Sequence, residues 1–190
     1  MGELDVDYQR DIVLSDRWNH VIFIRNVVER FISGFLDKVI HDCKVGLTKN
    51  VAISHYVQFG FSCEKHTKLE PFISFMEDLG VGKMEPHFAP QSPLCGFGLT
   101  GYRFFPNPNI IFADETLDES LNNLSKKLGV VHPIPSKNTT RHQTGAKNKL
   151  AALFKGKEEL ITRLLGLYVE DCKHFPRVCD VTQIVSSSEV

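Results

Sequence analysis

The pattern of apolar residues near the start of the chain predicts a strand followed by a helix. Residues 21–24 (VIFI) form a short, wholly apolar run rich in β-branched residues, which is typical of a strand covered on both faces in a parallel sheet. Asn26 then suits the N-cap of a helix, and Glu29 is placed to complete a variant of the capping box. The helix is indicated by apolar residues with i, i+3, i+4, i+7 spacing, namely Val28, Phe31, Ile32, Phe35, Leu36, Val39 and Ile40.

A second strand and helix are predicted further along the chain. Residues 110–112 (IIF) follow a proline-punctuated turn, which favours a strand. Residues 116–119 (TLDE) form a capping box that opens a helix, and Gly129 supplies its stop. The inward positions of this helix are Leu117, Leu121, Leu124 and Leu128. Strands that alternate with helices predict an α/β fold.

The remaining segments are less regular. Residues 44–68 have no clear apolar period and predict irregular structure, whereas residues 69–79 predict a helix that ends at Gly80. Residues 131–149 combine prolines, hydroxyls and basic side chains, which indicates a basic loop. Residues 158–175 predict one last helix. Because no internal repeat or linker is apparent, the sequence predicts a single domain over residues 1–190.

Composition excludes several classes of protein. The chain has 190 residues, of which 42% are hydrophobic and 24% charged, so a disordered chain is not expected. The formal net charge of −1 offers no general attraction to nucleic acid or to an anionic membrane, so we expect neither partner and any anion site must be local. The sequence has no apolar run of membrane-spanning length and begins with acidic and polar residues, so no anchor or export signal is expected in it.

The cysteines leave two possibilities open. None of them has the spacing of metal ligands, so no metal site is expected. All five thiols are reduced and mostly buried, or the compartment is oxidising and an odd thiol remains after pairing. Two N-x-S/T sequons, at Asn123 and Asn138, would suit a secretory lumen. The five positions are Cys43, Cys63, Cys95, Cys172 and Cys179.

The junction between the first strand and helix has the features of an anion site. A helix N-terminus presents unpaired N–H groups and the positive end of the helix dipole. Arg25 leaves the strand there, and Ser33 falls on the polar side of the helix beside Arg30. A guanidinium and a hydroxyl in this arrangement are suited to a phosphate. The alternative is that Arg25 is solvated or paired with a neighbour such as Glu29.

At these residues the sequence resembles a known family. RNVVERFISGFLDK is similar to the 3′-phosphate-binding motif of the Golgi carbohydrate sulfotransferases, R-D-P-F/I/L-E-R-F/L-I/V-S-A/G-F/Y-x-D/N-K, with Asn26 and Val27 in place of Asp and Pro. Residues 87–92 (HFAPQS) with Cys95 resemble the family's H-x-x-P-Q and Cys. Residues 113–130 and the segment from Arg141 resemble its E-T-L helix and its closing lid. The matches lie in order over residues 12–176.

The resemblance implies an α/β parallel-sheet, P-loop-kinase-like sulfotransferase fold. The family also carries a P-K-x-G/A-C/S-T/S loop around the 5′-phosphosulfate, and the residues before Arg25 contain no such motif. The expected domain is therefore incomplete at its N-terminus. The chain would then be a fragment, a short product of a longer gene, or a degenerate member of the family.

The resemblance also implies a reaction and its site. The donor would be 3′-phosphoadenosine-5′-phosphosulfate (PAPS), with Arg25 and Ser33 on its 3′-phosphate and the loop around Arg141 and His142 closing over the nucleotide. The acceptor would be a glycan or proteoglycan hydroxyl, no metal would be required, and the location would be the Golgi. Since an imidazole suits proton removal, we expect His87 either to act as the base on that hydroxyl or to position the acceptor.

Four alternatives stay open beside this. The chain is a catalytically inactive, sulfotransferase-like module that binds a nucleotide or a protein, or it is a soluble α/β protein with an accidental match. At the level of single residues, His87 and Gln91 brace a loop, and His142 is merely solvated.

Overall fold

A computed structural model describes residues 11, 15, 17–46, 51–95, 108–113, 117–130 and 152–182. The chain divides into two compact units. Unit one comprises Met1–Arg25 and Gln91–Asn138, and unit two comprises Asn26–Pro90 and Thr139–Val190. A single domain over residues 1–190 stays a prediction.

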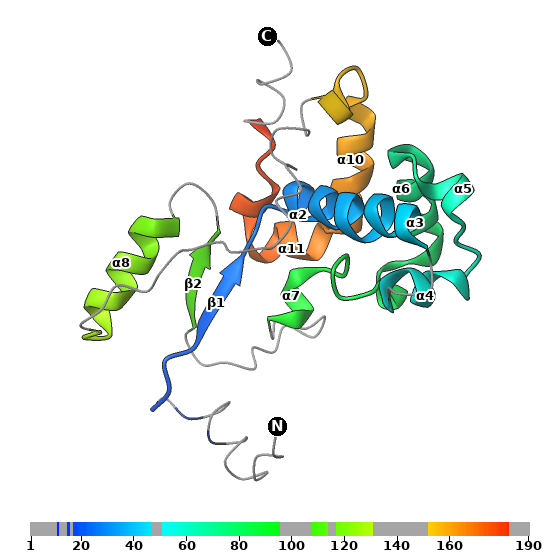
Figure 1. Ribbon diagram of the computed structural model, residues 1–190. Helices are drawn as coiled ribbons and strands as arrows, with labels where there is room; N and C mark the ends of the chain where they lie inside the picture. The colour runs from blue at the N-terminus through cyan, green and yellow to red at the C-terminus, as the bar shows by residue number, and fades with distance from the viewer. Residues whose placement is uncertain are drawn as a thin grey trace. The chain divides into compact units, whose positions relative to one another are not determined.

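Unit one is built on a pair of parallel strands. Strand β1 (Val21–Ile24) pairs with β2 (Asn109–Phe112) in a register that places Val21 opposite Asn109 and Ile24 opposite Phe112. Helix α8 (Leu117–Lys127) follows β2 and lies beside it (Figure 1). A small core of Ile111, Leu121 and Leu124 joins the helix to the sheet, with Val21, Leu117 and Leu128 packed against it. The predicted strands, the helix and their parallel arrangement are confirmed.

The prediction that β1 is covered on both faces is wrong. Ile22 and Ile24 are buried, whereas Phe23 between them is 51% exposed. On β2, Ile110 is 39% exposed beside the buried Ile111. Successive side chains of a strand point to opposite faces, so each strand of this pair buries one residue and exposes the next. An apolar run is compatible with burial of a strand on both faces. It does not show that both faces are in fact covered.

Unit two is helical. Helix α10 packs against α2 and α6, and α11 continues the chain after α10 (Figure 1). The helices and helical turns of this unit include α2 (Val27–Gly34), a π-helix (Phe35–His41), α3 (Asp42–Val45), α4 (Val51–Val57), α5 (Cys63–His66), α6 (Leu69–Leu79), a 3₁₀ turn (Val81–Lys83), α10 (Glu158–Leu167), α11 (Val169–His174) and a 3₁₀ turn (Pro176–Cys179).

The predicted helix after β1 is confirmed, and so is most of its buried face. Val28, Phe31 and Ile32 are fully buried, and Phe35 and Val39 continue the face. Leu36 and Ile40 are only partly buried. From Phe35 the helix widens into a π-helix, and this wider turn shifts the face away from the strict 3.6-residue period.

Two predictions about the helical segments are wrong. The segment expected to be irregular contains α4 and α5, because Tyr56 and Phe61 bury their rings in unit two and so stabilise helices too short to form alone. The expected single helix over residues 158–175 breaks at Tyr168, whose backbone has φ −116° and ψ 26°. Gly80 and Gly129 end their helices as predicted, at positive φ angles of 75° and 65°.

The cysteines resolve the alternatives left open by the sequence. Cys43 pairs with Cys63 at a Cα–Cα distance of 5.6 Å, and Cys172 pairs with Cys179 at 5.5 Å. Cys95 takes part in neither bond. The possibility of five reduced thiols is therefore wrong for this structure.

Candidate functional site

Arg25 lies at the end of β1 with its side chain exposed and its backbone held by Gln91. The Arg25 N–H donates to Gln91 Oε1 at 2.9 Å, and Gln91 Nε2 donates to the Arg25 carbonyl at 2.8 Å. Gln91 is only 6% exposed and begins α7 (Gln91–Leu94). The glutamine of the H-x-x-P-Q pattern therefore fixes the backbone from which the Arg25 side chain extends, which confirms that Gln91 is a brace.

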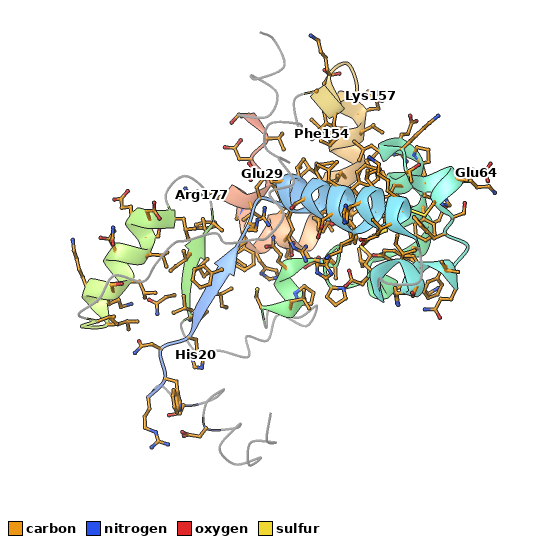
Figure 2. All side chains as sticks on the ribbon, in the orientation of Figure 1. His20, Glu29, Glu64, Phe154, Lys157 and Arg177 are labelled. Atoms are coloured by element: carbon orange, nitrogen blue, oxygen red, sulfur yellow. A yellow bond between two sulfur atoms is a disulfide. The ribbon has the colours of Figure 1, made fainter. Side chains whose placement is uncertain are left out.

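Asn26 caps α2 as predicted, and it makes one contact that aspartate cannot make. Its Oδ1 accepts from the N–H groups of Val28 and Glu29 at 3.0 and 3.1 Å. Its Nδ2 donates to the carbonyl of Asp180 at 2.9 Å. A carboxylate there would cap the helix but would face the Asp180 carbonyl without a proton to donate. This gives a physical account of Asn where the family pattern has Asp. Glu29 lies in the first turn of α2 (Figure 2), and its return bond to the cap stays a prediction.

Ser33 and Arg30 both belong to α2. Ser33 is half-buried in unit two, whereas Arg25 ends unit one, so the convergence of these two side chains on a phosphate stays a prediction. Arg30 donates from Nη1 to the carbonyl of Ala89 and from Nη2 to that of Pro86, each at 2.6 Å. Its guanidinium therefore holds the turn that carries His87.

His87 lies in this turn beside an acidic partner. Its Nδ1 is 2.6 Å from Glu85 Oε1, and its backbone N–H donates to Glu85 Oε2 at 2.9 Å. The His87 side chain is 54% exposed, whereas that of Glu85 is 10% exposed. A carboxylate at Nδ1 favours the tautomer in which Nδ1 carries the proton and Nε2 carries the lone pair. Such an imidazole can accept a proton at Nε2.

The rest of the turn is bonded to the core of unit two. The Glu85 N–H donates to the Tyr56 hydroxyl at 3.1 Å, and the Tyr168 hydroxyl donates to the Phe88 carbonyl at 2.7 Å. The Phe88 ring is fully buried, and a Cβ added at Gly34 would lie 3.0 Å from it. Side chains from α2, α4 and the segment after α10 thus fix one short turn, and only a small residue fits at position 34.

The buried tyrosine that supports this turn gives a pH-dependent prediction. Burial raises the pKa of Tyr168 well above its ordinary value of 10.0. In the unfolded chain this hydroxyl loses its proton from about pH 10, whereas in the folded chain it keeps the proton to higher pH. The neutral hydroxyl therefore contributes fully to stability below about pH 10, and this contribution falls as the pH rises further. We expect Tyr168→Phe to lose about 1 kcal/mol at neutral pH through the missing hydrogen bond, yet to show a flatter alkaline decline.

Urea unfolding at several pH values from neutral to alkaline would test this expectation. Burial also raises the pKa of Tyr56, so that residue keeps part of the alkaline decline in the variant. If the free energy of unfolding declined equally with pH in the wild type and in Tyr168→Phe, the expectation would be contradicted.

Charges from the π-helix complete the electrostatics around Glu85. Lys38 pairs with Asp37 at 2.9 Å. This hydrogen bond, helped by the charges of Asp42 and Glu85, raises the pKa of Lys38. Burial raises the pKa of Asp42. The acidic groups around Lys38 therefore stabilise its ammonium form.

Part of the predicted site lies outside the described residues. Arg141, His142 and the rest of the basic loop at residues 131–149 are outside. Where side chains are described, no cluster of three or more His, Cys, Asp and Glu residues could hold a metal ion. Within the same ranges no helix has both the length and the apolar character needed to cross a membrane.

The comparison with protein families decides the class of the protein. The model described as the sulfotransferase family matches residues 4–176, which include residues of both units. The chain belongs to the sulfotransferase family. No curated protein and no solved structure matches the sequence or the fold significantly. The alternative of an accidental match is therefore wrong, and the expected α/β sulfotransferase fold class is confirmed.

Membership carries a general activity and a general donor chemistry. The sulfotransferase family domain supports sulfotransferase activity, and it implies a sulfate donor of the PAPS type. The roles of Arg25, Ser33 and His87 stay predictions from the sequence. The sequence pattern missed Glu85, Arg30 and Tyr168, which hold the turn that carries His87. Glu85 had one local signal, since a carboxylate two residues before a histidine, across a proline, lies within reach of the imidazole.

Proposed function

We propose that this sulfotransferase-family chain is a carbohydrate O-sulfotransferase that transfers sulfate from PAPS to a glycan hydroxyl. The observation that carries the proposal is the His87 imidazole, exposed and oriented by Glu85 in a turn that the Arg30 of the 3′-phosphate motif holds in place. Arg30 of the 3′-phosphate motif thus holds the turn in which the H-x-x-P-Q motif supplies the proposed base, His87.

The proposed mechanism assigns one task to each group. Arg25 and Ser33 bind the 3′-phosphate and hold the donor, and Arg141 and His142 close over the nucleotide. His87 Nε2 takes the proton of the acceptor hydroxyl as the sugar oxygen bonds to sulfur and the bond from sulfur to the phosphate oxygen breaks. Adenosine 3′,5′-bisphosphate leaves, and His87 later returns its proton to solvent.

The compartment we propose is the Golgi lumen, with a glycan or proteoglycan as acceptor. Two disulfides, Cys43–Cys63 and Cys172–Cys179, favour an oxidising compartment over the cytosol. The resemblance to the Golgi carbohydrate sulfotransferases also supports this compartment.

Binding of adenosine 3′,5′-bisphosphate tests the nucleotide half of the proposal. We expect Arg25→Ala and Ser33→Ala each to weaken binding, Arg25→Ala by about 10- to 100-fold because a charged hydrogen bond is lost. Isothermal titration would measure both. Arg17→Ala removes the same charge from an exposed side chain, and Ser54→Ala removes a hydroxyl from an exposed position on α4, so these variants serve as matched controls. Equal affinity of all four variants for adenosine 3′,5′-bisphosphate would refute the proposed 3′-phosphate site.

Transfer tests the catalytic half. The chain incubated with sulfur-labelled PAPS and a panel of glycans should yield a labelled acceptor. Nucleotide binding without any labelled acceptor would instead favour the alternative, a catalytically inactive sulfotransferase-like binding module.

A further inference from the structure

Glu85 contacts His87 at two points, which is more than a simple charge pair requires. Its Oε1 lies 2.6 Å from the ring Nδ1, and its Oε2 accepts from the backbone N–H at 2.9 Å. Because the same carboxylate holds both the ring and the backbone of His87, it restricts the rotation of the imidazole about its side-chain bonds. Such a two-point hold fixes an orientation as well as a charge.

The carboxylate is itself anchored in unit two. The Glu85 side chain is 10% exposed, and its backbone N–H donates to the hydroxyl of the fully buried Tyr56. Tyr56 packs against Phe72 and Phe88 with ring centroids 6.4 and 6.0 Å apart. The partner of His87 therefore belongs to the packed core, while the imidazole extends toward solvent. This is the arrangement expected of a support for a reactive side chain.

Two basic side chains interact with the turn that carries the pair. Lys38 of the π-helix interacts electrostatically with Glu85. The Arg30 guanidinium lies against the carbonyls of Pro86 and Ala89, on either side of His87. An ionised carboxylate accepts hydrogen bonds and donates none, so it holds the imidazole with its proton on Nδ1.

We propose that Glu85 is a positioning residue that fixes His87 in the Nδ1–H tautomer and directs the Nε2 lone pair toward the acceptor hydroxyl. The inference rests on the proposed function of His87 as the base. The hydroxyl proton passes to Nε2, the sugar oxygen forms its bond to sulfur, and the bond from sulfur to the donor phosphate breaks. Glu85 takes no part in the proton transfer itself.

The Glu85→Gln variant distinguishes a role of Glu85 in orienting the imidazole from a role in holding the His87 backbone. Glutamine keeps the shape of the side chain and one acceptor oxygen, which can still bind the His87 N–H. The second position then carries an NH₂ group, which donates to Nδ1 and drives the ring proton to Nε2. We expect at least a tenfold fall in kcat, with little change in the KM for the acceptor or in nucleotide affinity. Glu85→Asp keeps a carboxylate and should recover part of kcat. Glu64→Gln, at an exposed position on α5, is the control (Figure 2).

Nitrogen-15 NMR of the imidazole gives a readout that does not depend on turnover. In alkaline buffer, the neutral His87 ring of the wild type and of Glu64→Gln should show a protonated Nδ1, and that of Glu85→Gln a protonated Nε2. An unchanged tautomer and kcat in Glu85→Gln would overturn the inference. Equal kcat losses in Glu85→Gln and Glu85→Asp that follow their loss of stability would also overturn it.

The failure of the proposed function would look different. A tautomer that changes in Glu85→Gln, with no transfer by the wild type, would support the positioning of His87 by Glu85 and refute catalysis by His87.

Discussion

Replacing His87 by alanine should lower the rate of sulfuryl transfer by about 10²- to 10⁴-fold, the usual contribution of a general base. Nucleotide affinity should stay almost unchanged, because the residues proposed for the 3′-phosphate are Arg25 and Ser33. The fold should also survive, because the His87 side chain is 54% exposed and the backbone N–H that binds Glu85 remains in the variant. The fall should therefore appear in kcat and not in the binding of the donor product.

Controls make the result for His87 specific. His41→Ala removes an exposed imidazole from the π-helix of the same unit and should leave kcat near that of the wild type. His87→Gln keeps a polar group of similar size but cannot accept and release a proton, so it should be as slow as His87→Ala. A His87→Gln variant with wild-type kcat would rule out the histidine as a base.

The local parts of the fold were predictable because they depend on neighbouring residues. Asn26 caps α2 through N–H groups two and three residues away, and the spacing of Val28, Phe31 and Ile32 places them on one face. The strand Val21–Ile24 has the same local origin. Whether both faces of the strand are covered could not be predicted, because the exposure of Phe23 depends on what packs against the sheet.

The supports of His87 could not be predicted, because they come from distant parts of the chain. Arg30 reaches carbonyls 56 and 59 residues further on, and Tyr168 reaches one 80 residues back. Helical spacing gives Arg30 a place on the polar side of α2 but says nothing of a partner there. The sequence therefore placed Arg30 beside Ser33 but did not indicate that its guanidinium binds the turn.

The small residue at position 34 illustrates the same limit. Sequence similarity indicates that glycine or alanine belongs there, but helix propensity alone argues against glycine inside a helix. The reason lies in the Phe88 ring, which leaves only 3.0 Å for a Cβ. The π-helix that follows Gly34 has no equally clear physical cause in the described contacts.

Phe88→Ala should reduce the free energy of unfolding by about 3–5 kcal/mol, the usual cost of deleting a buried aromatic ring. The ring is fully buried, and its centroid lies 5.2 Å from that of Phe72 and 5.5 Å from that of Phe31. The loss should also reach the site, because Phe88 is the residue after His87 and its ring anchors the turn. We therefore expect lower stability in urea unfolding together with a lower kcat for the fraction that is folded.

Phe72→Ala is the matched comparison for this prediction. Phe72 is equally buried in the same aromatic cluster but belongs to α6, outside the turn that carries His87. Both variants should lose similar stability, yet only Phe88→Ala should lower kcat when both are assayed below their unfolding transitions. If either alanine variant fails to fold, the milder pair Phe88→Leu and Phe72→Leu tests the same difference at a cost of about 1 kcal/mol. Equal kcat in the two members of a folded pair would mean that the ring stabilises unit two without positioning His87.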